Sequence, residues 1–161
     1  MMKIPVQNLP KICSDKLAEK TSDANAKSRL QQELDYIAKN EAYAEMFAVI
    51  GELVSYSREL GYYSRFMGSL GSSLIAFLLG ITEIDPLKYN LPAEVFMGVH
   101  DNKPLHTEMV FDVNFIPILK QYVRENYPHL VILDRCRTHF DWLVFSGDVT
   151  NWNTYGFDTD S

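Results

Sequence analysis

The chain has 161 residues, 47% of them hydrophobic, which suits one compact domain with a core of its own. It carries 15 basic and 21 acidic residues, so its formal net charge is −6, which argues against a dedicated nucleic-acid binder because such proteins depend on contacts with phosphates. The longest apolar run is too short to span a membrane, and Met1 to Pro10 lacks a signal-peptide core, so we expect a cytoplasmic protein.

Helical periodicity predicts the first elements of the chain. Apolar residues at helical spacing predict a short amphipathic helix over Leu9–Ala18, followed by a polar loop over Glu19–Ala26. A second helix is predicted over Lys27–Lys39. The longest periodic segment, Glu41–Leu60, predicts a third helix that ends at Gly61.

The third predicted helix has one apolar stripe. We expect this stripe to pack in the core, while Glu52, Ser55 and Arg58 face water. A partner helix is the alternative occupant. The stripe consists of Tyr43, Met46, Phe47, Ile50, Leu53, Val54, Ser57 and Leu60.

A glycine- and serine-rich segment comes next, between a short aromatic strand predicted over Tyr62–Phe66 and an apolar helix predicted over Leu74–Leu79. Small residues allow close backbone approach, and the free N–H groups of a first helical turn form an anion site. Capping of the helix by the serine hydroxyls is the simpler alternative. The candidate residues are Gly68, Ser69, Gly71, Ser72 and Ser73.

The C-terminal half alternates between strand and helix patterns. Thr107–Phe115 alternates in polarity and predicts a half-buried strand, with Met109, Phe111, Val113 and Phe115 on its buried face and Glu108, Val110, Asp112 and Asn114 on its outer face. Ile116–Tyr127 then predicts a helix, and Leu130–Leu133 a short buried strand. His139–Phe145 fits either a helix or a strand.

Metal-binding residue types are scattered. Cys13 and Cys136 have no partners at ligand spacing, so we expect reduced thiols rather than a disulfide or zinc site. The histidines also lack metal spacing and are expected at the surface or the edge of the core. They are His100, His106, His129 and His139.

The stretch Gly80 to Leu91, GITEIDPLKYNL, follows the glycine-serine loop and its apolar helix. This arrangement resembles the palm of the bacterial replicative DNA polymerase III alpha subunit, a C-family polymerase. The likeness keeps its order and spacing from about Leu9 to Leu133 and leaves residues 134–161 unmatched. It implies an α/β (α+β) fold of the nucleotidyltransferase type, with a small mixed sheet covered by helices in a single palm-like domain over residues 1–161.

The resemblance also implies a site. In such palms a pair of aspartates separated by one residue bridges two metal ions. The second aspartate matches Asp112, but the first falls on Val110, and the arginine that precedes the Gly-Ser loop is replaced by Met67. Only a vestigial metal ligand, Asp112, and a vestigial nucleotide-binding loop are therefore expected. That loop comprises Gly68, Ser69, Gly71, Ser72 and Ser73.

Other parts of the family site have no clear counterpart. Arg65 lies two positions before Met67. On a strand its side chain would share the face of Met67, but it would not reach the position of the family's arginine. Asp141 or Asp148 is a candidate third carboxylate, although a solvated surface aspartate is the simpler interpretation of each. The fingers, thumb and nuclease regions of the family have no counterpart within these 161 residues, so we expect a stand-alone, degenerate palm.

These features predict a catalytically inactive palm-like protein that acts by binding a protein, with no cofactor. Such a partner could be a replication protein, or the chain could be an inhibitor from a phage or mobile element, of the anti-CRISPR type. The alternative is a nucleotide-binding or residual nucleotidyltransferase domain that uses Gly68–Ser73 and Asp112 with one Mg²⁺. A gene remnant without a role is a third hypothesis. The partner and the oligomeric state stay open.

Overall fold

The computed structural model describes residues 2–39, 41–97, 106–130, 132–137 and 140–146. Helices dominate the N-terminal part of the chain, and an antiparallel sheet follows, so an α+β arrangement is confirmed. The elements are η1 (Val6–Asn8), α1 (Leu9–Lys20), α2 (Ala24–Ala38), α3 (Glu41–Glu59), β1 (Ser64–Met67), η2 (Ser69–Ser72), α4 (Leu74–Leu78), α5 (Glu94–Met97), β2 (His106–Phe111), α6 (Ile116–Asn126), β3 (Ile132–Arg137) and β4 (Phe140–Ser146).

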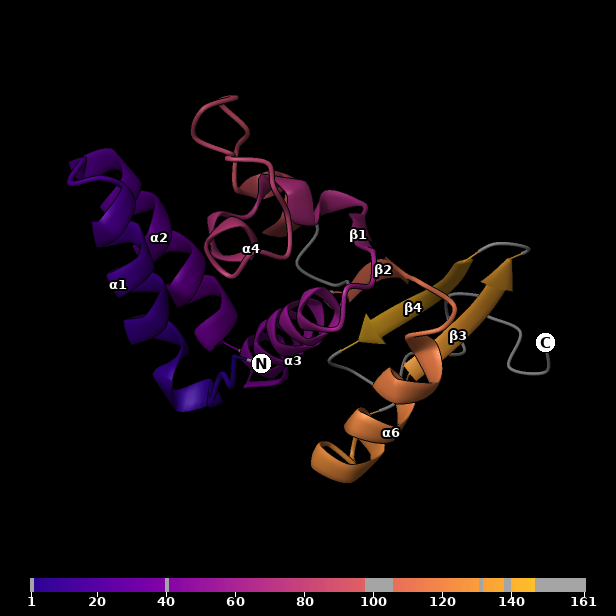
Figure 1. Ribbon diagram of the computed structural model, residues 1–161. Helices are drawn as coiled ribbons and strands as arrows, with labels where there is room; N and C mark the ends of the chain where they lie inside the picture. The colour runs from indigo at the N-terminus through magenta and orange to yellow at the C-terminus, as the bar shows by residue number, and fades with distance from the viewer. Residues whose placement is uncertain (1, 40, 98–105, 131, 138–139, 147–161) are drawn as a thin grey trace.

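The sheet has four strands in the order β1-β2-β4-β3, and every neighbouring pair is antiparallel. The predicted mixed sheet is therefore wrong. After β2, the helix α6 returns the chain so that β3 runs in the direction of β2, as in a crossover. However, β4 turns back and inserts between β2 and β3. The parallel strands β2 and β3 are therefore not neighbours (Figure 1).

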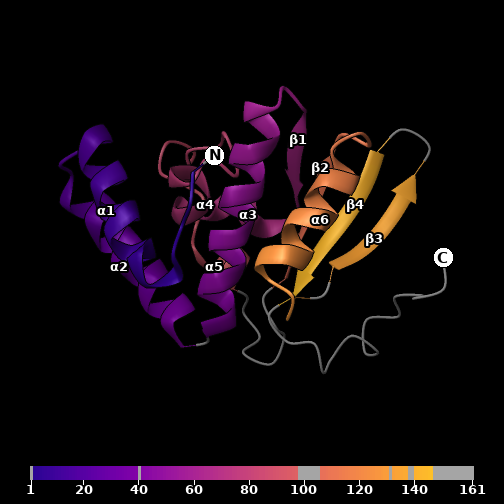
Figure 2. The ribbon, with the colours of Figure 1, turned by 60° about the horizontal axis from the view of Figure 1, so that its bottom comes forward.

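The helices surround α3. In both views α1 and α2 lie together on one side of α3, and the sheet and α6 lie on the other side (Figures 1 and 2). The core follows this arrangement, because α3 buries apolar side chains towards both sides. The largest fully buried side chains are Phe47, Phe111, Phe115, Ile4, Leu9, Ile50, Leu53, Leu70, Leu74, Ile75, Met109 and Leu119.

The predicted helices are confirmed, but the loop predicted over Glu19–Ala26 is too long. Helix α1 continues to Lys20, and α2 begins at Ala24. The carboxylate of Asp23 accepts a hydrogen bond from the backbone N–H of Asn25, so this residue caps α2. The short helix α5 (Glu94–Met97) was not predicted.

The strand predicted over Thr107–Phe115 ends earlier, at Phe111. Residues 112–115 instead form a turn, in which the N–H of Phe115 donates to the carbonyl of Asp112 before α6 begins. Alternation alone could not locate this end, because Phe115 is buried in the turn just as a strand residue would be. The segment His139–Phe145, for which helix and strand were both open, contains the strand β4 from Phe140 onwards.

Two predictions about the burial of residues in the third predicted helix are wrong. Leu60 was expected in the core but is 44% exposed, because α3 ends at Glu59 and the chain turns away. Glu52 was expected to face water but is 1% exposed. None of the helices in the described ranges is both long and apolar enough to cross a membrane.

Candidate functional site

Strand β1 leads into the glycine-serine segment at Gly68, whose φ of 84° favours glycine. The next residues form the 3₁₀ helix η2 and then the one-turn helix α4. Gly71 is also constrained, because a Cβ atom there would lie 3.0 Å from the ring of Phe66. The segment is therefore a close-packed turn, as its small residues predicted.

The start of α4 holds an anion that belongs to the chain itself. The N–H groups of Leu74 and Ile75 donate to the two carboxylate oxygens of Glu33, over 2.9 and 3.0 Å. The hydroxyl of Ser73 also donates to Glu33, over 3.0 Å. Glu33 is fully buried on α2, so its negative charge occupies the place where N–H groups at a helix start would bind a phosphate.

Arg29 fixes this carboxylate. Its Nε atom lies 2.7 Å from Glu33 Oε1, one helical turn away on α2. Its other two nitrogens donate to the carbonyls of Leu91 and Ser72, over 2.9 and 2.6 Å. One guanidinium therefore ties α2 to the glycine-serine segment and to the turn at Leu91, in a geometry that lysine could not reproduce.

The serine hydroxyls of the candidate loop are largely used inside the protein. Ser72 donates to the carbonyl of Ser69 over 2.9 Å, and Ser73 accepts from the N–H of Ala76 over 3.1 Å. Ser72 and Ser73 are buried, whereas Gly68 and Ser69 are exposed. The alternative of helix capping is confirmed for Ser73, and nucleotide binding by the loop stays a prediction.

Asp112 lies in the turn between β2 and α6. Its N–H donates to the carbonyl of Tyr63 over 3.0 Å. Its Oδ1 atom accepts from the backbone N–H of Asn114 over 2.8 Å and from the side-chain amide of Asn114 over 3.1 Å. This is a turn-forming aspartate. Val110, two residues earlier, is only 7% exposed, although the alternation placed it on the outer face.

The strand register separates the two halves of the expected site. Met67, which precedes the loop, pairs with Glu108, whereas Asp112 is bonded to Tyr63 before β1 begins. Five residues of extended chain connect Tyr63 to Gly68, about 16 Å at roughly 3.3 Å per residue. The structure thus places Asp112 and Gly68 at opposite ends of β1.

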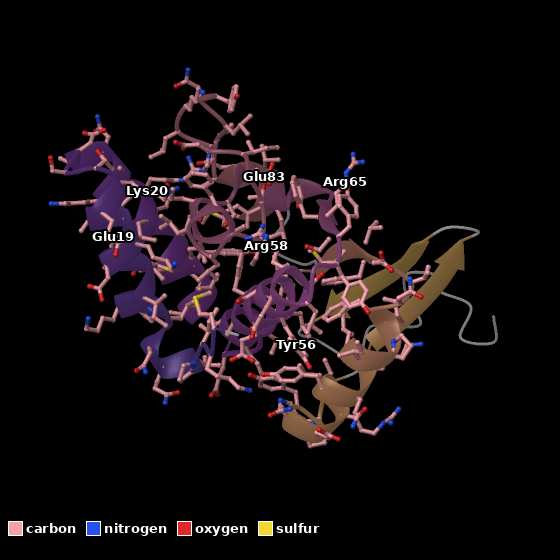
Figure 3. The ribbon with its side chains drawn as sticks, in the orientation of Figure 1. Glu19, Lys20, Tyr56, Arg58, Arg65 and Glu83 are labelled. Carbon is pink, nitrogen blue, oxygen red and sulfur yellow. The ribbon has the colours of Figure 1, made fainter. Side chains whose placement is uncertain are left out.

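The other charged candidates of the expected site are Arg65, Asp141 and Asp148. Arg65 pairs with Val110 and extends outwards from β1, away from the rest of the sheet (Figure 3). In β4, the backbone of Asp141 is in register with Phe111, directly before Asp112. Asp148 lies outside the described residues. Among the side chains that the structure describes, no three His, Cys, Asp or Glu residues form a group that could hold a metal ion.

A second buried carboxylate, Glu52 on α3, was missed by the sequence reasoning. It accepts from the N–H of Ile4 and from the hydroxyls of Tyr122 and Tyr127, each over 2.7 Å. Burial and the hydrogen bond to Glu52 raise the pKa of both tyrosines above their usual range. Lys3 also donates to the Tyr122 hydroxyl. This network fastens the N-terminal segment and α6 to α3.

The chain is similar to a known protein family and to several bacterial DNA polymerases. Residues 7–132 match the family described as the bacterial DNA polymerase III alpha NTPase domain. The error-prone DNA polymerase of Cutibacterium acnes is 32% identical over 105 residues, which cover 65% of this chain and 9% of that polymerase. The DNA polymerase III subunit alpha of Mycoplasma genitalium is 31% identical over 144 residues, which cover 81% of this chain and 16% of the relative.

A third relative, the PolC-type DNA polymerase III of Caldanaerobacter subterraneus, is 29% identical over 138 residues, which cover 60% of this chain and 10% of the relative. The chain thus spans about a tenth to a sixth of the length of these polymerases. The matched region holds the helices, the glycine-serine segment and the first two strands.

Proposed function

This chain belongs to the family of the bacterial DNA polymerase III alpha NTPase domain, and we propose that it is a palm-type domain that has lost two-metal nucleotidyl transfer and acts by binding another protein. The order of elements supports the palm part of this proposal. A strand leads into a glycine-serine turn and a helix, and the neighbouring antiparallel strand ends beside the candidate metal ligand.

The observation that carries the loss of catalysis is the pair of residues that flank Asp112. A two-metal site needs a second carboxylate on the same side of the chain, two residues away. In one direction that position holds Val110, a buried hydrocarbon, and in the other it holds Asn114, a neutral amide bonded to Asp112 itself. A single carboxylate provides too little negative charge to bring two strongly hydrated Mg²⁺ ions together.

Protein binding is supported by apolar side chains around the same turn. Leu60 is 44%, Tyr63 60% and Val113 42% exposed, and the carbonyl of Tyr63 is bonded to the N–H of Asp112. We call these three residues the Asp112-end surface.

The net charge of −6 favours a basic protein surface as the partner. An inhibitor of a nucleic-acid-binding protein is one form of this proposal, because carboxylates could occupy positions meant for phosphates. A phage or mobile-element origin and a cytoplasmic location stay predictions.

Site-specific photocrosslinking tests whether a protein binds the Asp112-end surface. Tyr63 is replaced by a photoreactive phenylalanine analogue in the expressed protein, and Tyr89, which has the same 60% exposure, is replaced in the control. The proposal predicts a discrete crosslinked species from position 63, which disappears when Val113 is changed to Asp. Equal crosslinking from both positions, or none from position 63, would refute the surface.

The second candidate function is a residual nucleotide-binding domain with one Mg²⁺. The register of β4 supports this candidate, because Asp141 pairs with Phe111, the residue directly before Asp112. Calorimetry with dATP and Mg²⁺ separates the candidates. Mg²⁺-dependent heat that is lost in both Asp112→Ala and Asp141→Asn would support residual binding, and its absence at millimolar ligand would support the first proposal.

A further inference from the structure

A surface pocket on the opposite side of α3 from the sheet has an unusual lining for an acidic protein. It has a volume of about 380 Å³ and lies between α1, the end of α3 and the end of α4. This volume falls within the roughly 300–1,000 Å³ that is typical of small-molecule sites. Its polar and aromatic lining comprises Lys16, Glu19, Lys20, Ser55, Arg58 and Phe77.

Three positive charges therefore meet one negative charge in this pocket, although the whole chain is negative. Figure 3 shows Glu19 and Lys20 on α1 and Arg58 at the end of α3, with α4 between them. Within the described part of the chain, neither lysine nor Arg58 lies within ion-pair distance of a carboxylate. Their charges are thus available to an anion in the pocket.

Arg58 is held in position. One of its terminal nitrogens donates to the carbonyl of Gly80 over 2.6 Å, which also covers the oxygen that would otherwise repel an anion. A Cβ atom on Gly80 would lie only 2.9 Å from the guanidinium, and φ at Gly80 is +73°. Glycine at this position therefore lets the guanidinium approach the backbone closely, with its remaining N–H groups unused by the described residues.

Phe77 gives the pocket an aromatic wall. The ammonium group of Lys20 lies 5.0 Å from the centre of the Phe77 ring, a cation–π contact. Met2 and Leu79 also line the pocket, so part of the wall is apolar. A free phosphate would use the cations alone, whereas an organic phosphate would use the cations and this wall.

We propose that this pocket binds an organic phosphate, with the phosphate groups between Lys16, Lys20 and Arg58 and the organic part against Phe77. The site is separate from the turn that contains Asp112 and from the glycine-serine segment, and it needs no metal ion. The proposal therefore stands apart from the function proposed above.

Calorimetry in EDTA tests this site with ATP, pyrophosphate and inorganic phosphate as probes. We expect saturable ATP binding that is stronger than pyrophosphate binding and that weakens by about tenfold or more in Lys16→Gln/Lys20→Gln. Lys11→Gln, on the same helix but outside the pocket, serves as the matched control and should leave binding unchanged. Asp112→Ala should also have no effect, which separates this site from the palm.

A gain of affinity gives an independent readout that does not depend on a damaged variant. Glu19→Gln removes the negative charge from the lining and should tighten ATP binding. The proposal would be overturned if no probe gave heat, or if Lys16→Gln/Lys20→Gln bound ATP as tightly as the unmodified protein. Weaker ATP binding in Glu19→Gln would overturn it as well. Pyrophosphate binding as tight as ATP binding would refute the role of the aromatic wall.

Discussion

The Oγ atom of Ser73 lies 3.0 Å from the Oε2 atom of Glu33, a contact between residues 40 positions apart. The helix start that the sequence marks as an anion site thus receives its anion from α2. Because Arg29 holds the other side of the carboxylate, the arrangement is a charge-balanced and hydrogen-bonded buried group.

Neutralising this carboxylate should destabilise the fold. Glu33→Gln keeps the size of the side chain but removes the charge that pairs with Arg29 and leaves one acceptor oxygen for four donors, so we expect a loss of about 3 kcal/mol in the free energy of unfolding. Urea denaturation followed by circular dichroism measures it. Asp35→Asn, on the exposed face of α2, is the control and should change stability by no more than about 0.5 kcal/mol.

The Glu52 network predicts a loss of stability in alkali. The pKa values of Tyr122 and Tyr127 are raised in the folded protein, whereas an unfolded tyrosine titrates near its ordinary value of 10.0. Above about pH 10 the unfolded state loses these protons first, so the unfolded state binds fewer protons and stability falls as pH rises. The stability that the raised pKa values of these tyrosines contribute is fully present below pH 10.

Urea midpoints between pH 8 and pH 11 check this dependence. Tyr122→Phe and Tyr127→Phe should each cost about 1–2 kcal/mol at pH 8, because a buried carboxylate loses a donor. Each variant should also show a shallower decline above pH 10. A decline as steep as in the unmodified protein would mean that other tyrosines cause it.

Two glycines with positive φ form a natural pair for measuring the role of Arg58. Gly80 (φ +73°) has the guanidinium 2.9 Å from its would-be Cβ atom, whereas Gly61 (φ +78°) has nothing within 4 Å. Gly61→Ala should cost about 1 kcal/mol from backbone strain alone, and Gly80→Ala about 1 kcal/mol more, because Arg58 must leave the Gly80 carbonyl.

Repeating both substitutions in an Arg58→Ala background isolates the contact. The difference between the two alanine variants in thermal or urea unfolding should then vanish. A difference that persists without Arg58 would show that the backbone of Gly80, rather than the guanidinium, is the source of the cost.

Cys13 should be unreactive in the folded protein. Burial raises the pKa of this thiol to about 12, so almost none of it is thiolate at neutral pH. In a Cys136→Ser variant, we expect modification by iodoacetamide at pH 8 to be roughly 100-fold slower, or more, in the native protein than in urea. Comparable rates in the two conditions would contradict the buried placement.

Much of the fold follows from local patterns, and the exceptions have identifiable causes. The helix ends at Lys20 and Glu59 and the strand at Ser64–Met67 lie close to their predicted positions, because periodicity and glycine signals act locally. The burial of Glu52 was not predictable from α3, since its donors Ile4 and Tyr122 lie 48 and 70 residues away. The position of β4 between β2 and β3 is likewise a tertiary choice.

The candidate site shows the same division. The close packing of the loop at Gly71 was predictable from its small residues. The occupation of the α4 start by Glu33 had one available signal, a glutamate among Leu30, Leu34 and Ile37 on the apolar face of its helix, with Arg29 one turn before it. The end of β2 at Phe111, which places Asp112 in a turn, depends on contacts with Tyr63 that periodicity does not report.

The central claim, that two-metal chemistry has been lost, is tested most directly by counting bound ions. Mn²⁺ is titrated into the protein with and without dATP, and bound ions are measured by electron paramagnetic resonance, with Asp112→Ala as the control. The account predicts at most one protein-dependent Mn²⁺ per chain in the presence of dATP. Two ions per chain that both disappear in Asp112→Ala would contradict it.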